Sequence, residues 1–149
     1  MSDYITNKKA YFDYDILETF EAGVLLTGAE VKSVRAGKAS LNGAYVIIRG
    51  GEAYLVNASI SPYQMANTPK RYDPERARKL LLHTKELAAL EQASEGKNLT
   101  IVALKWYNKS RYLKLAIALA RGKKKVDKRE TLKQRDSTRD ISRIMKGQL

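Results

Sequence analysis

Apolar and polar residues alternate in several short stretches of the chain, and this alternation predicts a mainly β structure. Strands are expected at 11–17, 23–27, 45–49, 52–57, 100–107 and 111–120. The residues Glu21-Ala22-Gly23 are expected to form the turn between the first two strands. The pair Gly50-Gly51 predicts a tight hairpin turn between the third and the fourth, because both glycines accept a positive φ.

The two strands expected between 100 and 120 show the clearest alternation. In the later strand, one face is predicted to be apolar and is formed by Leu113, Leu115, Ile117 and Leu119. The opposite face is then able to meet solvent or a ligand. The earlier strand is expected to place Val102, Leu104 and Trp106 on one face and Ile101, Ala103, Lys105 and Tyr107 on the other.

Two regions break this pattern and predict short helices. The first helix is expected at 30–36 and ends at Gly37, a residue that suits the position just after a helix. The second region starts at Asp73, a capping residue, and runs on to Leu82 with a proline at its first helical position.

A further helix is expected at 85–93, after Thr84 as a capping residue. The span 57–72 holds two of the three prolines and several polar residues, so it is expected to be a loop.

Short strands with interspersed helices predict an OB-type closed β-barrel of about six strands, with two or three short flanking helices. A two-layer α+β sheet is the competing architecture. We divide the chain into a barrel core at 1–120 and a basic tail at 121–149. The tail is expected to be disordered when it is free.

The tail carries a disproportionate share of the positive charge. It has eleven Lys or Arg against four Asp or Glu, so it holds +7 of the formal net charge of +12. It has no aromatic residue, and its six aliphatic residues bury too little area to offset its ordering entropy. Arginines recur at every fourth position from Arg135 to Arg143, which places them on one stripe of a helix. The pattern indicates a latent helix that folds against a polyanion.

Composition excludes several classes of protein. The chain has no cysteine, so disulfides, Cys-ligated zinc, iron–sulfur clusters and thiol catalysis are excluded. The first residues lack the apolar region of a signal peptide, and the longest apolar runs are too short to cross a bilayer. We therefore expect a cytoplasmic protein with no membrane segment. The high net charge favours nucleic acid or the ribosome as a partner.

Few residues are arranged for catalysis, and we predict no catalytic residue, metal site or cofactor. His83 is the single histidine and has no nucleophile motif near it. The stretch 37–40 resembles a phosphate loop only superficially, because no Ser or Thr directly follows Lys38. Asp13 and Asp15 stand at strand spacing and point to one face, which leaves a metal-dependent nuclease as an alternative.

Basic groups recur through the barrel core, and nine tyrosines and one tryptophan are interleaved with them. The groups are Asn7-Lys8-Lys9, Lys32/Arg35/Lys38, Arg76/Arg78/Lys79, Lys105/Lys109/Arg111/Lys114 and Lys123-Lys124-Lys125. Lys and Arg bind phosphates, and unpaired bases stack on aromatic faces, so the pattern favours RNA binding. Glu30 is interpreted as a residue that orients neighbouring basic groups or accepts a hydrogen bond from RNA.

Six ordered stretches carry a resemblance to a known family. They are NKKA at 7–10, FEAGVLLTGAEVKSVRAGKASL at 20–41, GEAYL at 51–55, RARKLLL at 76–82, ALARGKKKVDKRETLKQRD at 118–136 and RIMK at 143–146. Together they resemble the SmpB family, the SsrA-binding small proteins of bacteria. The resemblance covers about 7–146, and the ordered set is far more specific than any one stretch.

This resemblance implies an OB-type barrel on which the tRNA-like domain of transfer-messenger RNA rests. The implied function is trans-translation, the rescue of stalled ribosomes, without any chemistry by the protein itself. The tail is expected to reach the decoding centre of the small ribosomal subunit and to fold in the empty messenger channel. We expect a monomer. A structural ribosomal protein remains a third hypothesis.

The resemblance also implies which residues face RNA. In the barrel core they are Asn7, Lys8, Lys9, Glu30, Lys32, Ser33, Arg35, Gly37, Lys38, Lys123, Lys124 and Lys125. In the tail, the residues expected to bind the ribosome are Asp127, Lys128, Arg129, Lys133, Arg135, Arg139, Arg143, Ile144 and Met145. The chain departs from the family at Val126, where some members carry an aromatic residue or histidine that stacks on ribosomal RNA. Stacking is therefore not carried over to this position.

Overall fold

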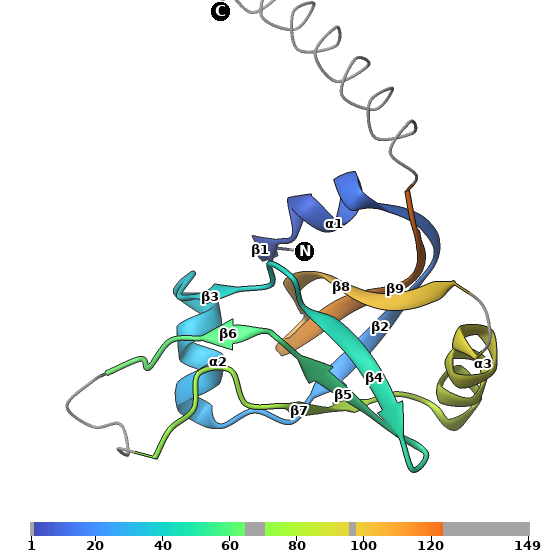
Figure 1. Cartoon of the computed structure of the whole chain (residues 1–149). Coiled ribbons are helices and arrows are strands. Elements are labelled where there is room, and N and C mark those ends of the chain that lie inside the picture. The colour runs from blue at the N-terminus through green and yellow to red at the C-terminus, as the bar shows by residue number, and fades with distance from the viewer. Residues whose placement is uncertain (1, 65–70, 96–97, 124–149) are drawn as a thin grey trace, which may run out of the picture.

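The computed structural model describes residues 2–64, 71–95 and 98–123 (Figure 1). The first half contains β1 (Ser2–Thr6), α1 (Lys8–Asp13), β2 (Tyr14–Val24), α2 (Gly28–Arg35), β3 (Ala39–Ser40), β4 (Tyr45–Arg49) and β5 (Glu52–Val56). The second half contains β6 (Ser59–Ile60), β7 (Arg78–Leu81), α3 (Thr84–Ser94), β8 (Leu99–Lys109) and β9 (Tyr112–Gly122).

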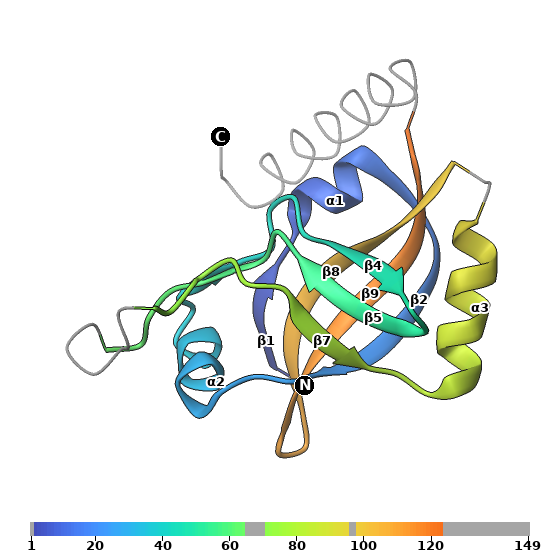
Figure 2. The ribbon, with the colours of Figure 1, turned by 60° about the horizontal axis from the view of Figure 1, so that its bottom comes forward.

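Six of these strands close into a ring. Antiparallel pairings run in the order β8, β4, β5, β7, β2 and β9, and β9 pairs back onto β8. β1 adds to β8, while β3 and β6 form a separate two-stranded sheet. Figure 2 shows α2 and α3 on opposite sides of this ring. The predicted closed barrel with short flanking helices is thus confirmed, and the two-layer alternative is wrong. Arg121 and Gly122 of the predicted tail belong to β9, so the disorder expected for these two residues is wrong, and the tail from residue 124 onwards lies outside the described part.

The barrel interior forms the main hydrophobic core. The alternation predicted for β9 is confirmed on its inner face, where Leu115 and Ile117 are fully buried. Only part of the outer face of β9 meets solvent. Ala118 and Ala120 on that face are buried in a second cluster, which also contains Ala10 of α1. α1 therefore covers part of the barrel's outer surface.

A β-bulge in β8 overturns one predicted pattern. The register of β8 against β9 shifts between Ala103 and Lys105. Because of this extra residue, Trp106 packs in the main core with Ile101 and Ala103 and not with Leu104. The predicted grouping of Trp106 with Leu104 is therefore wrong, since strict alternation fails across a bulge.

Two segments near the N-terminus also differ from the predictions. Residues 11–13 belong to α1, because Asn7 caps that helix and accepts a hydrogen bond from the Ala10 backbone N–H at 3.2 Å. The turn predicted at 21–23 is wrong, since β2 continues through it. β2 pairs with β9 up to residue 22 and with β7 from Gly23 onwards, so one long strand connects two parts of the ring.

A helix was predicted from 73 to 82, but the second half of this segment forms the strand β7. β7 lies between β5 and β2, pairing with Tyr54 and Leu55 of β5 and with Gly23 and Val24 of β2. Without a strand here the ring has no closure between β5 and β2. Long-range strand pairing therefore overrides the local preference of this segment for a helix.

The remaining predictions for helices and hairpins agree with the structure. α2 and α3 lie where helices were expected, although α3 is capped by His83 and not by Thr84. The hairpin at Gly50-Gly51 is confirmed, with φ values of 61° and 75°. The segment 57–72, expected to be a loop, contains the short strand β6.

Candidate nucleic-acid interface

Three exposed cations gather where α2 ends. Lys32 and Arg35 lie in the last turn of the helix, and Lys38 follows shortly after it. Gly37 has a φ of 77°, and this left-handed conformation turns the chain sharply at the helix end. We call Lys32, Arg35 and Lys38 the α2 cations. Cations at a helix C-terminus are also favoured by the helix dipole.

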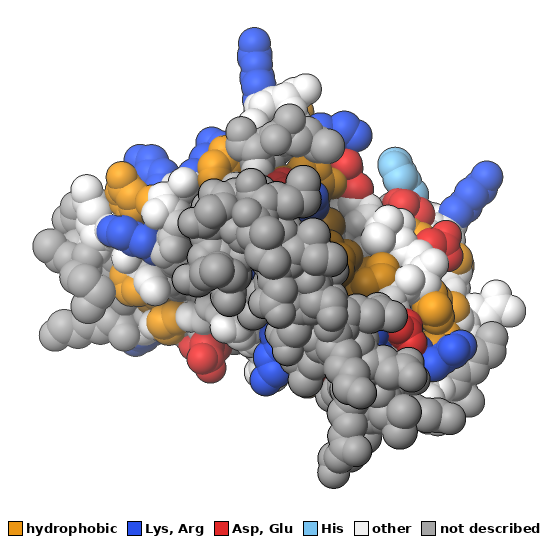
Figure 3. Space-filling view, turned by 90° about the horizontal axis from the view of Figure 1, so that it is seen from above, with side chains coloured by type: hydrophobic (Ala, Val, Ile, Leu, Met, Phe, Trp, Pro, Cys, Tyr) orange, Lys and Arg blue, Asp and Glu red, His pale blue; other side chains and the backbone are white. Residues whose placement is uncertain are grey.

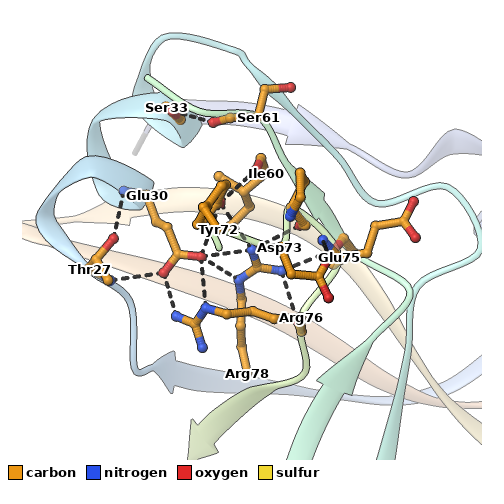
Figure 4. Close-up of polar contacts among 12 residues, drawn as sticks. Thr27, Glu30, Ser33, Ile60, Ser61, Tyr72, Asp73, Glu75, Arg76 and Arg78 are labelled. Atoms are coloured by element: carbon orange, nitrogen blue, oxygen red, sulfur yellow. Dashed lines mark hydrogen bonds and ion pairs between the residues drawn. The ribbon is translucent and has the colours of Figure 1, made fainter. Parts of the chain in front are cut away.

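Glu30 of the same helix occupies the centre of a buried polar network (Figure 4). Its side chain is 1% exposed, and the backbone N–H of Thr27 donates to it at 3.0 Å. Arg78 donates through Nε at 2.9 Å and through a terminal nitrogen at 2.7 Å. Arg76 forms a second ion pair with the carboxylate, and the Tyr72 hydroxyl donates to it at 3.3 Å. This network fixes α2 to the segment that leads into β7.

The charge state of this network follows from its contacts. Burial disfavours the charged form of Glu30, but hydrogen bonds from Arg76, Thr27 and Arg78 outweigh burial and lower the pKa of Glu30 to about 2. Arg78 is itself 0% exposed and donates further hydrogen bonds to the carbonyl oxygens of Ala58, Arg76 and Pro74. The buried carboxylate and guanidinium are therefore well provided with hydrogen bonds, as buried charges require.

Glu30 thus orients basic groups, as the sequence indicated, but its partners were not foreseen. They are Arg76 and Arg78, which lie 46 and 48 residues further along the chain, and not the neighbouring Lys32 and Arg35. The sequence signal for these partners was the RARKLLL stretch, where two arginines precede an apolar run.

Two more predicted RNA-binding residues, Asn7 and Ser33, have buried side chains. The side-chain amide of Asn7 donates to the carbonyl oxygens of Leu41 at 2.8 Å and Ala103 at 2.9 Å. The Ser33 hydroxyl donates to the carbonyl oxygen of Ser61 at 2.7 Å. Direct RNA contact by these side chains stays a prediction, and their geometry indicates that they position the backbone around them.

Arg35 connects α2 to the turn between β8 and β9. One of its terminal nitrogens donates to the carbonyl oxygen of Arg111 at 3.1 Å and to the Asn108 side chain at 3.4 Å. Arg111 and Lys109 of the same turn are exposed. The α2 cations therefore continue into a second group of cations that is distant in sequence but adjacent in space.

An open groove of about 530 Å³ lies between the barrel and the start of α3. Leu81 on its wall is 49% exposed, although neighbouring Leu80 is buried. Lys79 and Lys114 also line the groove, together with Glu21. Glu52 and Glu86 line it too, and Lys79 pairs with Glu52 at 3.0 Å, so the exposed leucine suits apolar contact with RNA better than the lysines suit phosphate. No local pattern in the sequence predicts this site, because its walls come from segments that are far apart in the chain.

Glu21 in this groove is held in its charged form. Its carboxylate accepts a hydrogen bond from the Tyr107 hydroxyl at 2.8 Å and pairs with Lys109 at 3.3 Å. The hydrogen bond from Tyr107 lowers the pKa of Glu21. Burial, helped by the same carboxylate, raises the pKa of Tyr107.

Comparison with known proteins decides the family. The family model described as "SmpB protein" matches residues 4–147 of this chain. The chain belongs to the SmpB family. It is 54% identical over 140 residues to an SsrA-binding protein from Gloeothece citriformis, a match that covers 94% of this chain and 90% of the relative. An SsrA-binding protein from Streptococcus pneumoniae is 49% identical over 141 residues, covering 95% of this chain and 90% of the relative.

A solved structure supports the same assignment. A chain from work described as "tmRNA-SmpB: a journey to the center of the bacterial ribosome" superposes with a TM-score of 0.68 at 47% identity. The match covers 83% of this chain and 87% of that chain. Because the identity is high and the coverage is broad, both the SmpB fold and the residue correspondence apply to most of the molecule.

The other cations predicted for the SmpB-family interface divide into two sets. Lys8 and Lys9 are exposed on α1, and the Lys123 backbone N–H donates to the Asp13 carbonyl oxygen at 2.9 Å. The start of the tail, which follows β9, therefore lies beside the end of α1. Lys124, Lys125 and all tail residues predicted to bind the ribosome lie outside the described part. On the face seen from above, Lys and Arg side chains stand out around the rim of the visible surface (Figure 3).

The geometry expected for a nuclease is not present at Asp13 and Asp15. Asp13 ends α1 and Asp15 lies in β2, so the two do not share one strand face. Within the described ranges, no group of three His, Cys, Asp or Glu residues could hold a metal ion. Within the same ranges, no helix is long and apolar enough to cross a membrane.

Proposed function

We propose that this chain is an RNA-binding adaptor for ribosome rescue by trans-translation. It binds the tRNA-like domain of transfer-messenger RNA and delivers that RNA to stalled ribosomes. The observation that carries the proposal is the match to relatives named SsrA-binding protein along nearly their whole length. The superposed chain described with tmRNA and the bacterial ribosome points to the same partners. On this proposal the protein works in the cytoplasm, as a monomer and without a catalytic step.

The described structure supports the binding half of this function. A closed barrel fixes its surface groups before RNA arrives, which reduces the entropy lost on binding. The Glu30 network holds α2 on that barrel, so the α2 cations have a defined position. Phosphates then bind to cations that are already in place, while the groove beside Leu81 offers apolar contact.

The tail supplies the second half of the proposal. Its +7 charge and few aliphatic residues make it unstable alone and foldable among phosphates. The division expected at 120/121 moves slightly, and we place the functional boundary between core and tail just after β9, which ends at Gly122. The tail folds as a helix in the messenger channel only when no message occupies it, so ordering of the tail reports an empty channel.

Copurification tests the proposal directly. The full chain is expressed with an affinity tag in bacteria, and the RNA it retains is sequenced. Transfer-messenger RNA is expected as the main species, and an in vitro reaction with ribosomes stalled on a message without a stop codon is expected to yield tagged peptides. Retention of only ribosomal RNA, on translating and stalled ribosomes alike, contradicts the proposal and favours a structural ribosomal protein.

A further inference from the structure

Tyr63 lies close to two of the three α2 cations. The ammonium nitrogen of Lys38 is 5.4 Å from the centroid of the Tyr63 ring, and that of Lys32 is 5.9 Å from it. Both distances fall within the range of a cation–π contact. The ring therefore brings together two ammonium groups that come from different sides of Gly37.

The backbone at Ser61, two residues before Tyr63, is held against α2 and the residues that follow it. The Ser61 backbone N–H donates to the Lys38 carbonyl oxygen at 3.0 Å. The carbonyl oxygen of Ser61 accepts the 2.7 Å hydrogen bond from the buried hydroxyl of Ser33. β6, just before Ser61, pairs with β3, where Ile60 faces Ala39. Both polar groups of the Ser61 backbone are thus bound to α2 or to the residue just after its end, and Tyr63 follows two residues later.

The two lysines keep their charge available for a ligand. Carboxylates in the described part of the chain form ion pairs with other cations, namely Arg76, Arg78, Lys79, Lys105 and Lys109. Lys32 and Lys38 are exposed, and Tyr63 is half-buried. Among the described residues, no carboxylate is an ion-pair partner of Lys32 or Lys38. Two such ammonium groups beside an aromatic ring match the chemistry of a nucleotide, with phosphate on the cations and base on the ring.

We infer that Tyr63 stacks on one unpaired RNA base while Lys32 and Lys38 bind the phosphates that flank it. This inference rests on the proposed function, because it names a base-stacking residue within the same RNA interface. The ligand class is an unpaired nucleotide of structured RNA, which either transfer-messenger RNA or ribosomal RNA supplies. The stacking contact at Tyr63 distinguishes this site from a purely electrostatic surface, since stacking does not depend on neutralising phosphates.

The test compares substitutions that separate stacking from charge. Tyr63→Phe keeps the ring, Tyr63→Leu removes it, and Lys38→Gln removes one charge. Affinity is measured by filter binding of the full chain to two probes, the tRNA-like domain of transfer-messenger RNA and purified small ribosomal subunits, at several salt concentrations. Tyr11→Leu is the matched control, because Tyr11 is 44% exposed on α1 and is not part of this cluster. Thermal unfolding of each variant confirms that it is folded.

The expected pattern differs among the variants. On at least one probe, Tyr63→Leu weakens binding about 5- to 150-fold, the range for loss of one stacked base, and leaves the salt dependence unchanged. Tyr63→Phe and Tyr11→Leu stay within about two-fold of the original protein. Lys38→Gln reduces the slope of log affinity against log salt by roughly 0.7–0.9. The probe that responds identifies the source of the base.

Two outcomes overturn the inference. If Tyr63→Leu binds both probes as tightly as the original protein, no base stacks there. If it reduces the salt slope as much as Lys38→Gln does, the ring only positions the lysines. Failure of the proposed function looks different, because the unmodified chain itself then does not bind the tRNA-like domain.

Discussion

Replacing Glu30 with glutamine isolates the buried charge network from the rest of the α2 interface. Glutamine has nearly the same volume and keeps an oxygen for the Thr27 backbone N–H. It removes the negative charge, so Arg78 stays ionised at 0% exposure without its counter-ion. Breaking a buried ion pair in this way destabilises a protein by about 3–5 kcal/mol. Against a typical stability of roughly 5–15 kcal/mol, this is a large fraction.

The lowered pKa of Glu30 reflects the same contacts and gives a figure of similar size. A fall from the ordinary value of 4.5 to about 2 corresponds to about 3 kcal/mol of preference for the charged carboxylate in the folded state. Since the folded pKa is lowered, this stability is present above about pH 4.5. It is lost as pH falls towards about 2, because the unfolded chain binds the proton first. In the Glu30→Gln variant, this part of the acid dependence is expected to be missing.

Urea unfolding followed by tryptophan fluorescence measures the effect. Trp106 is the single tryptophan and is fully buried in the barrel core, so its emission reports the core directly. Glu52→Gln is the matched control. Glu52 pairs with Lys79 at 3.0 Å, but both side chains are 40% exposed or more, and such surface pairs contribute little. An equal loss of stability in the two variants, or an unchanged acid dependence in Glu30→Gln, refutes the argument for a buried network.

Three further predictions address other parts of the molecule. Ending the chain after Arg129 is expected to leave affinity for transfer-messenger RNA within a few-fold but to abolish peptide tagging; a matching loss of RNA affinity contradicts the division of labour. Lys124→Ala is expected to reduce the slope of log RNA affinity against log salt by roughly 0.7–0.9, and an unchanged slope removes this lysine from the phosphate contacts. Asn7→Ala removes the hydrogen bonds that the Asn7 amide donates to the carbonyl oxygens of Leu41 and Ala103 and the one it accepts from Ala10, and is expected to destabilise the fold by about 2–3 kcal/mol without changing the salt slope of RNA binding. If the Asn7→Ala variant unfolds at the same urea concentration as the original protein, Asn7 does not stabilise the fold in this way.

Signals between residues close in sequence determined several elements correctly. Gly50-Gly51 predicted its hairpin, Gly37 marked the end of α2, and alternation predicted the inner face of β9. These features depend on the preferred φ of glycine and on the period of two in a strand, which are properties of a few adjacent residues. The family was also readable at this level, because ordered motifs extend from Asn7 to Lys146.

Other features depended on residues that meet only in the folded chain. The strand at β7 forms because β5 and β2 need a partner between them to close the ring, and its local sequence favours a helix. The bulge in β8 moves Trp106 to the inner face, against the alternation of its neighbours. The periodicity of the sequence predicts neither the β7 strand nor the β8 bulge, because each depends on pairing between residues that are far apart in the chain.

The candidate interface divides in the same way. The sequence by itself determined which residues are charged, how strongly the tail is basic, and that α2 ends in cations. Tertiary structure alone decided that Glu30 is buried against Arg78, and that Lys32 and Lys38 meet at Tyr63. Charge is a property of each residue, whereas burial and proximity arise only when distant segments pack together.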